Sequence, residues 1–269
     1  MPKTKTYIFT RINLGLHRYS ETGPDGKNPW KDINEWMQQR YDLFLETAYP
    51  SVMQQTDMDF DYCLLLDRKT SGQWVHKYHG VKGVRIFLLD TERYDIHPVG
   101  RHRMHHMGVV SKLLNDDSEL VITSRLDSDD CIHKDYVRAV KENLPEEPGH
   151  SLHFANGYYN MRSEPKGVYE IEFHNNMFPA VIESRGDMKT VFAQEHTVLE
   201  RSFNSSVIKT DPMWMWNWWP KKLNLSSQTS TYQRRRGFPP LDSATKVEAY
   251  SGIECDFGYN ENAIQEKLI

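Results

Sequence analysis

The chain has 269 residues, of which 38% are hydrophobic and 26% are charged, a composition typical of a globular protein with one large domain or two small ones. Its formal net charge of −4 argues against a protein that binds nucleic acid through a broad positive surface. The three cysteines are far apart and form no CxxC pair, which argues against a disulfide-linked scaffold and a cysteine zinc site.

Strand-like and helix-like segments alternate through the first half of the chain. In such an alternating fold the sheet is mostly parallel, helices cover both of its faces, and ligands bind beyond the carboxyl ends of the strands. We therefore expect the functional site just after the predicted strands. These strands lie at 6–11, 60–66, 84–89 and 119–124, and the predicted helices lie at 30–46, 101–114 and 133–144.

The second half of the chain is richer in strand-like segments, with little helix between them. From about residue 224 the sequence is polar and rich in Ser, Thr, Gly and Pro, which is typical of loops. We expect one domain over residues 1–223, with halves at 1–130 and 131–223, and a loop-rich tail over 224–269. The predicted strands of the second half lie at 151–159, 167–173, 180–183 and 190–193.

The most aromatic segment is PMWMWNWWP at 212–220, which prolines bracket. No basic amphipathic helix accompanies it, so we expect a packed or acceptor-facing loop, with peripheral membrane contact as the alternative. No segment approaches the ~18 apolar residues of a membrane span, and the N-terminus lacks the apolar run of a signal peptide. We therefore expect a cytoplasmic protein.

Three carboxylates, Asp127, Asp129 and Asp130, directly follow the strand predicted at 119–124. Like charges this close are unfavourable unless a positive group lies among them. In an extended segment Asp127 and Asp129 point to the same side, where Mn²⁺ or Mg²⁺ would bridge them to a diphosphate. Arg125 adds positive charge toward that phosphate. Asp130 is instead interpreted as the N-cap of the following helix.

The segment RLDSDDCIHKDYV at 125–137 resembles the motif of a rhamnosyltransferase family within the GT-A glycosyltransferases. The resemblance covers roughly residues 6–220 and implies a GT-A fold: a Rossmann-type, mostly parallel sheet flanked by helices, with a β-rich, irregular C-terminal half. It also implies a divalent cation, a dTDP-, UDP- or GDP-sugar donor, and a glycan or other hydroxyl acceptor. Further matching segments are TRINLGL at 10–16, Trp30 with Arg40, PSVMQQ at 50–55, FDYCLLLD at 60–67, NNMFPAVIE at 175–183 and KTVFAQEHTVL at 189–199.

The resemblance implies that nucleotide-binding residues follow the first strand, where Thr10, Arg11 and Asn13 stand. Arg40, among the aromatic residues of a predicted helix, is a candidate to reach a phosphate. Asp67, at the end of the second strand, is a candidate for the ribose or the base. For each of these residues the alternative is a solvated turn or a surface charge. Arg125 and Asp127 complete the predicted donor site.

An inverting transferase needs a base that takes the proton of the acceptor hydroxyl. The segment QEHTVL resembles the acidic element that supplies this base in GT-A enzymes, which makes Glu195 the candidate base and His196 a candidate metal or phosphate ligand. Glu183 and Asp187 are rival candidates for the base.

We therefore predict a metal-dependent glycosyltransferase that moves a hexosyl group, with rhamnose as the candidate sugar, to an acceptor hydroxyl with inversion. Two alternatives stay open. A nucleotidyltransferase of related shape typically has a glycine-rich phosphate loop, whereas TRINLGLHR at 10–18 has one glycine. A non-catalytic carbohydrate- or nucleotide-binding protein of the same fold would show no metal dependence.

Overall fold

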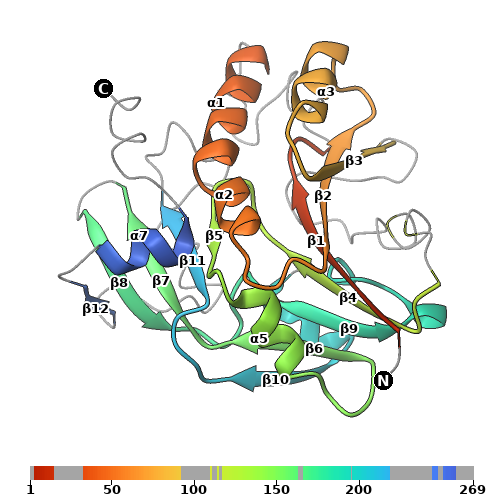
Figure 1. Cartoon of the computed structure of the whole chain (residues 1–269), viewed down its shortest axis with the longest axis vertical. Helices are drawn as coiled ribbons and strands as arrows, with labels where there is room; N and C mark the ends of the chain where they lie inside the picture. Colours follow the sequence, from red (N-terminus) through yellow and green to blue (C-terminus); the bar gives the residue numbers. More distant parts are fainter. Residues whose placement is uncertain are drawn as a thin grey trace.

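The computed structural model describes residues 3–14, 33–91, 110, 114, 117–162, 166–194, 196–218, 244–247 and 251–258. In these residues two β-sheets lie side by side, with helices packed around them (Figure 1).

The large sheet has seven strands in the order β10-β6-β9-β4-β1-β2-β3. Strands β1 to β4 run parallel to one another, and the antiparallel β9 connects β4 to the parallel pair β6 and β10. The four strands predicted for the first half are confirmed, and their carboxyl ends meet at one edge. The bounds are β1 Thr4–Arg11, β2 Asp61–Asp67, β3 Val84–Leu89, β4 Leu120–Arg125, β6 His150–Phe154, β9 Ala180–Ser184 and β10 Asn204–Ile208.

The small sheet has five strands in the order β12-β8-β7-β11-β5. Strand β5 begins directly after the acidic segment that follows β4, so the chain passes from one sheet to the other through that segment. The predicted strand 151–159 is divided between the two sheets as β6 and β7. The bounds are β5 Cys131–Ile132, β7 Asn156–Met161, β8 Gly167–Glu172, β11 Trp214–Trp218 and β12 Thr245–Lys246.

The helices bury one side each. The buried side chains of Trp36, Met37 and Phe44 of α1 pack in the core that includes strands of the large sheet. The buried side chain of Leu43 packs instead with Cys131 and Met215 of the small sheet. The bounds of the helices are α1 Ile33–Glu46, α2 Ala48–Met53, α3 Gly72–His79, α5 Tyr136–Glu142 and α7 Ser251–Phe257, and those of the 3₁₀ turns are η2 Arg185–Asp187 and η3 His196–Arg201.

Trp214 joins the two sheets. Its ring stacks on Phe178 at a centroid distance of 5.3 Å, and its indole N–H donates to the carbonyl of Phe154 at 2.8 Å. On the neighbouring strand, a Cβ atom at Gly157 would lie 2.1 Å from the Trp214 ring. Glycine is therefore the residue that lets this indole lie flat against the backbone.

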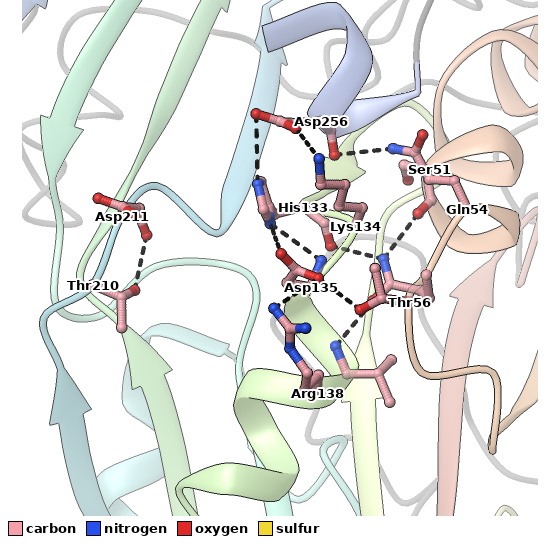
Figure 2. A network of polar contacts seen from close by, with 12 residues as sticks. Ser51, Gln54, Thr56, His133, Lys134, Asp135, Arg138, Thr210, Asp211 and Asp256 are labelled. Atoms are coloured by element: carbon pink, nitrogen blue, oxygen red, sulfur yellow. Dashed lines mark hydrogen bonds and ion pairs between the residues drawn. The ribbon is translucent and has the colours of Figure 1, made fainter. Parts of the chain in front are cut away.

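The C-terminal helix α7 is fastened to the segment that follows β5 (Figure 2). The backbone carbonyl of Asp256 accepts hydrogen bonds from Gln54 Nε2 and the Lys134 N–H, both at 2.9 Å. The Asp256 carboxylate lies 2.5 Å from Lys134 Nζ and 3.8 Å from His133 Nε2. The part of the tail that the structure describes is therefore packed on the domain.

Several elements differ from the sequence prediction. Residues 190–193 form a turn, in which the Val191 N–H donates to Thr123 Oγ1 at 2.8 Å, and not a strand. The segment predicted as a loop at 212–220 contains β11, because its alternating side chains suit a strand. Of the tail predicted as loop-rich, the structure describes residues 244–247 and 251–258, which include β12 and α7, and the prediction for the rest of the tail stays untested. Most of the helix predicted at 101–114 lies outside the described residues.

Candidate active site at the end of the fourth strand

The acidic segment lies where the parallel strands of the large sheet end. The N–H of Leu126 donates to the Phe9 carbonyl at 2.9 Å, which keeps the chain beside β1 just past the end of β4. Residues 127–130 then form a turn, in which the Asp130 N–H donates to the Asp127 carbonyl at 3.2 Å. The expectation that this segment is extended is therefore wrong.

Two arginines hold Asp127. Arg125 Nη2, at the end of β4, donates to the two carboxylate oxygens of Asp127 at 3.0 and 3.2 Å. Arg11 Nη2, at the end of β1, lies 3.8 Å from Asp127 Oδ1. The Arg125 side chain is only 6% exposed, whereas that of Asp127 is 34% exposed. The Asp127 carboxylate is therefore partly exposed to solvent and lies next to the buried, positively charged side chain of Arg125.

A third arginine, Arg40 from α1, holds Asp129. Its Nη1 lies 2.8 Å from Asp129 Oδ2, and both side chains are 11% exposed. The Arg40 guanidinium also lies 5.5 Å from the centre of the Trp36 ring. Burial alone would lower the pKa of Arg40, but the charges of Asp129 and Asp127 and the hydrogen bond with Asp129 raise it on balance. Arg40 therefore points into the site and is not a surface charge.

Asp130 connects the turn to β11. Its Oδ1 accepts the backbone N–H of Asn217 at 2.9 Å. Burial, together with the charges of Asp129 and Asp127, raises the pKa of Asp130 well above its usual value. Helix α5 begins at Tyr136 with Asp135 as its N-cap residue, so the interpretation of Asp130 as the cap is wrong.

The sequence prediction missed Asn217, which fixes the acidic turn from β11. Its side-chain amide donates to the Asp129 carbonyl at 2.8 Å and accepts from Asn160 Nδ2 at the same distance. Asn217 is 1% exposed. A polar residue in the middle of the alternating segment WMWNW is the signal that would have indicated a buried role for it.

Three predicted nucleotide-binding residues lie near the acidic turn and form hydrogen bonds with their own neighbours. Thr10 Oγ1 lies 2.9 Å from the Tyr62 hydroxyl, and Thr10 is fully buried. Asn13 Oδ1 accepts the backbone N–H of Asp67 at 3.1 Å. The Asp67 carboxylate in turn accepts the Lys69 N–H at 2.8 Å and the Thr91 hydroxyl.

A pocket lies next to these residues, beyond the ends of β2 and β3. Its volume is about 300 Å³, and its walls carry both cationic and anionic side chains. The position agrees with the rule that ligands bind beyond the carboxyl ends of parallel strands. The lining residues are Asp67, Arg68, Lys69, Asp90 and Thr91.

Glu183 lies far from the acidic turn. It is paired with Val121 at the opposite end of β4, roughly 20 Å from Asp127 at about 3.3 Å per residue. Its two carboxylate oxygens accept the backbone N–H groups of Lys189 and Thr190, each at 2.7 Å. Burial raises the pKa of Glu183, although these two hydrogen bonds oppose the shift. This placement favours a structural role for Glu183.

The other acid–base candidates lie outside the description. Glu195 and the side chains of Asp187 and His196 are not among the residues that the structure describes. Within the described ranges, no group of three or more His, Cys, Asp or Glu side chains converges as a metal site. The two carboxylates of Asp127 and Asp129 nevertheless fit a cation of the magnesium type, because such ions are commonly held by one or two carboxylates together with substrate phosphates.

Comparison with known proteins identifies the family. The family model described as "Putative rhamnosyl transferase" matches residues 32–231, well over half of the chain. No curated protein matches the chain. Among the described residues, no helix has the length and apolar character needed to cross a membrane.

Solved structures give distant similarities. TarS 1–349 of S. aureus is 13% identical over 79% of this chain and 60% of that chain, with a TM-score of 0.42. The same protein in complex with UDP is 14% identical over 81% and 62%, with a TM-score of 0.40. A "putative nucleotide-diphospho-sugar transferase" from Desulfovibrio desulfuricans G20 is 12% identical over 87% and 91%, with a TM-score of 0.37. The chain thus spans less than two thirds of TarS 1–349.

The family match confirms the predicted resemblance, and the parallel β1–β4 arrangement with its β-rich second half agrees with the GT-A fold that the resemblance implied. The chain therefore belongs to the family described as "Putative rhamnosyl transferase".

Proposed function

We propose that the chain is a glycosyltransferase that moves a sugar from a nucleotide-diphospho-sugar to an acceptor hydroxyl, with the diphosphate bound at the turn of Asp127 and Asp129. The observation that carries the proposal is the convergence of Arg11, Arg40 and Arg125 on these two carboxylates. The three cations come from β1, α1 and β4, so the fold has to be complete before they meet.

The arginines have a role in the chemistry as well as in the fold. When the donor splits, negative charge develops on the leaving diphosphate, and positive groups already in place stabilise it without reorganisation. Arg125 and Arg40 are held by packing, because their side chains are 6% and 11% exposed. Each is placed to exchange part of its contact with a carboxylate for a phosphate oxygen.

A divalent cation, Mn²⁺ or Mg²⁺, belongs to the same proposal. The carboxylates of Asp127 and Asp129 would hold it, and it would supply further neutralisation of the leaving group. Asp127 is the more accessible ligand, since its side chain is 34% exposed. A cation at the carboxylates would also free the arginines for the diphosphate.

The nucleoside is proposed to occupy the pocket beside Asp67. The Asp67 carboxylate and the neighbouring backbone lie at the ends of β2 and β3, next to the end of β1 that carries Arg11. A dTDP-, UDP- or GDP-sugar is the donor class, and rhamnose is the sugar that the family description favours. Glu195 is proposed as the base for an inverting transfer, and His196 as an additional metal or phosphate ligand.

The test is the thermal stability of the purified protein with UDP, GDP, dTDP or CDP, each with Mn²⁺ or with a chelator. A ligand that binds only the folded state raises the melting temperature by mass action. We expect one nucleotide to stabilise the protein, to do so more strongly with Mn²⁺, and to lose its effect in Asp129→Ala. Asp135→Ala is the matched control, since Asp135 is an acid ion-paired with Arg138 at 3.1 Å in the adjoining segment.

Two outcomes would contradict parts of the proposal. If no nucleotide stabilises the protein with any cation, the donor site is not where we place it, and a non-catalytic protein of this fold becomes the better account. If a nucleotide stabilises the protein equally with Mn²⁺ and with chelator, the arginines alone bind the diphosphate and the metal requirement is wrong.

A further inference from the structure

Strand β11 carries a row of tryptophans that leaves the core toward the candidate active site. Trp214, Trp216 and Trp218 alternate along the strand and so lie on the same face of the small sheet. Trp214 is 1% exposed, whereas Trp216 and Trp218 are half-buried. The rings of Trp216 and Trp218 are 4.9 Å apart, centre to centre, with an interplanar angle of 41°.

The exposed end of this row lies beside the acidic turn. β11 pairs antiparallel with β5, with Met215 opposite Cys131, so residues 216–218 run alongside residues 128–130. Asn217, between the two tryptophans, bonds to both Asp129 and Asp130. Neighbouring strands are about 4.8 Å apart, so the backbone that carries the two indoles lies about one strand spacing from the acidic turn.

A third aromatic side chain completes the cluster. Tyr159 on β7 is the register partner of Trp216, and its ring lies 5.2 Å from that of Trp216 and 6.4 Å from that of Trp218. Its hydroxyl is buried and has no hydrogen-bond partner among the described residues. A buried hydroxyl without a partner is unfavourable, so this atom is suited to a hydrogen bond from a bound molecule that carries hydroxyl groups.

We propose that Trp216 and Trp218, with Tyr159, bind a pyranose ring of a carbohydrate acceptor. One face of a pyranose carries C–H groups that pack on an indole, and its edges carry hydroxyls that turn toward polar neighbours. A sugar on this surface presents a hydroxyl toward the turn of Asp127 and Asp129, where the donor is placed. The inference rests on the proposed function and names the acceptor as a glycan, in place of a lipid or peptide hydroxyl.

The experiment measures acceptor and donor binding separately. Tryptophan fluorescence and calorimetry follow the binding of methyl glycosides and of di- and trisaccharides of rhamnose, glucose, galactose, mannose and N-acetylglucosamine, with nucleotide and Mn²⁺ present. Vesicles of anionic phospholipid are tested in the same way. The variants are Trp218→Ala, Trp216→Ala and the conservative Trp218→Phe. Leu88→Ala is the control, because Leu88 is 46% exposed on β3 at the far edge of the large sheet.

We expect at least one saccharide to change the indole fluorescence. Trp218→Ala should weaken its binding about tenfold or more, Trp218→Phe should weaken it less, and Leu88→Ala should leave it unchanged. The nucleotide-dependent rise in melting temperature should be the same in all four variants, which separates this inference from the donor proposal. Three results would overturn the inference: no saccharide binds, binding survives both alanine variants, or vesicles and not saccharides shift the fluorescence.

Discussion

Asp129 and Glu183 are two buried carboxylates at opposite ends of one strand pair, and they have different kinds of partner. Over the whole residue, Asp129 is 8% exposed and Glu183 is 4% exposed, so burial does not distinguish them. Asp129 pairs with the long side chain of Arg40, whereas Glu183 accepts two backbone N–H groups of a turn. A side-chain partner can rotate toward a ligand, but a backbone partner cannot leave without unfolding the turn. The partner therefore tells more about the role of a buried acid than burial does.

The sharpest test of this comparison is Asp129→Asn, which keeps the shape and removes the charge. We expect the rate of sugar transfer to fall by about 10²–10³-fold, because the carboxylate that is proposed to hold the cation and that positions Arg40 loses its charge. The measurement is steady-state transfer or, without an acceptor, hydrolysis of the nucleotide-sugar. Asp135→Asn is the control. An active Asp129→Asn enzyme would remove Asp129 from the donor site.

Glu183→Ala should instead act on stability. It leaves the N–H groups of Lys189 and Thr190 without acceptors, and each unpaired buried group costs about 1–3 kcal/mol. We expect the free energy of unfolding, measured in urea, to fall by about 2–4 kcal/mol, while nucleotide still raises the melting temperature. Glu183→Gln keeps one acceptor oxygen and should lose less. A stable but inactive Glu183→Ala protein would restore Glu183 as the base.

His153 extends the comparison to a buried titratable group without either kind of partner. Neither ring nitrogen has a hydrogen-bond partner among the described residues, and burial lowers the pKa of His153 from 6.5 to about 4. As the pH falls through this window, the unfolded chain takes up a proton that the folded chain refuses, so stability decreases. We expect a loss of roughly 2–3 kcal/mol between pH 7 and pH 4 that His153→Phe abolishes. An unchanged pH profile in that variant would show that other groups dominate.

Asn217→Ala is expected to have the smallest effect, because it removes a support of the acidic turn and no part of the charge. The Asp129 carbonyl and the Asn160 amide each lose a hydrogen bond, which should lower the free energy of unfolding by about 1–2 kcal/mol. Transfer should slow less than in Asp129→Asn. Urea unfolding and transfer rates measured side by side decide this. An Asn217→Ala enzyme as inactive as Asp129→Asn would make the position of the turn as important as its charge.

Local sequence patterns predicted the elements that depend on near neighbours. The first four strands are short apolar segments bounded by polar residues, and the three acids follow the last of them directly. The same logic failed at 212–220, where the bracketing prolines suggested a loop although the alternation of WMWNW forms β11. It also failed at Asp130, where the next helix begins too late for this residue to cap it.

The sequence by itself determined the family, the parallel first half and the position of the acids at a strand end, because these depend on periodicity and on motifs of adjacent residues. Only the tertiary structure decided which charges meet. Arg40 reaches Asp129 from a helix far back in the chain, and Asn217 reaches Asp130 from a later strand. Such contacts arise because packing the two sheets and α1 together brings distant side chains within hydrogen-bond distance, and no local pattern encodes that distance.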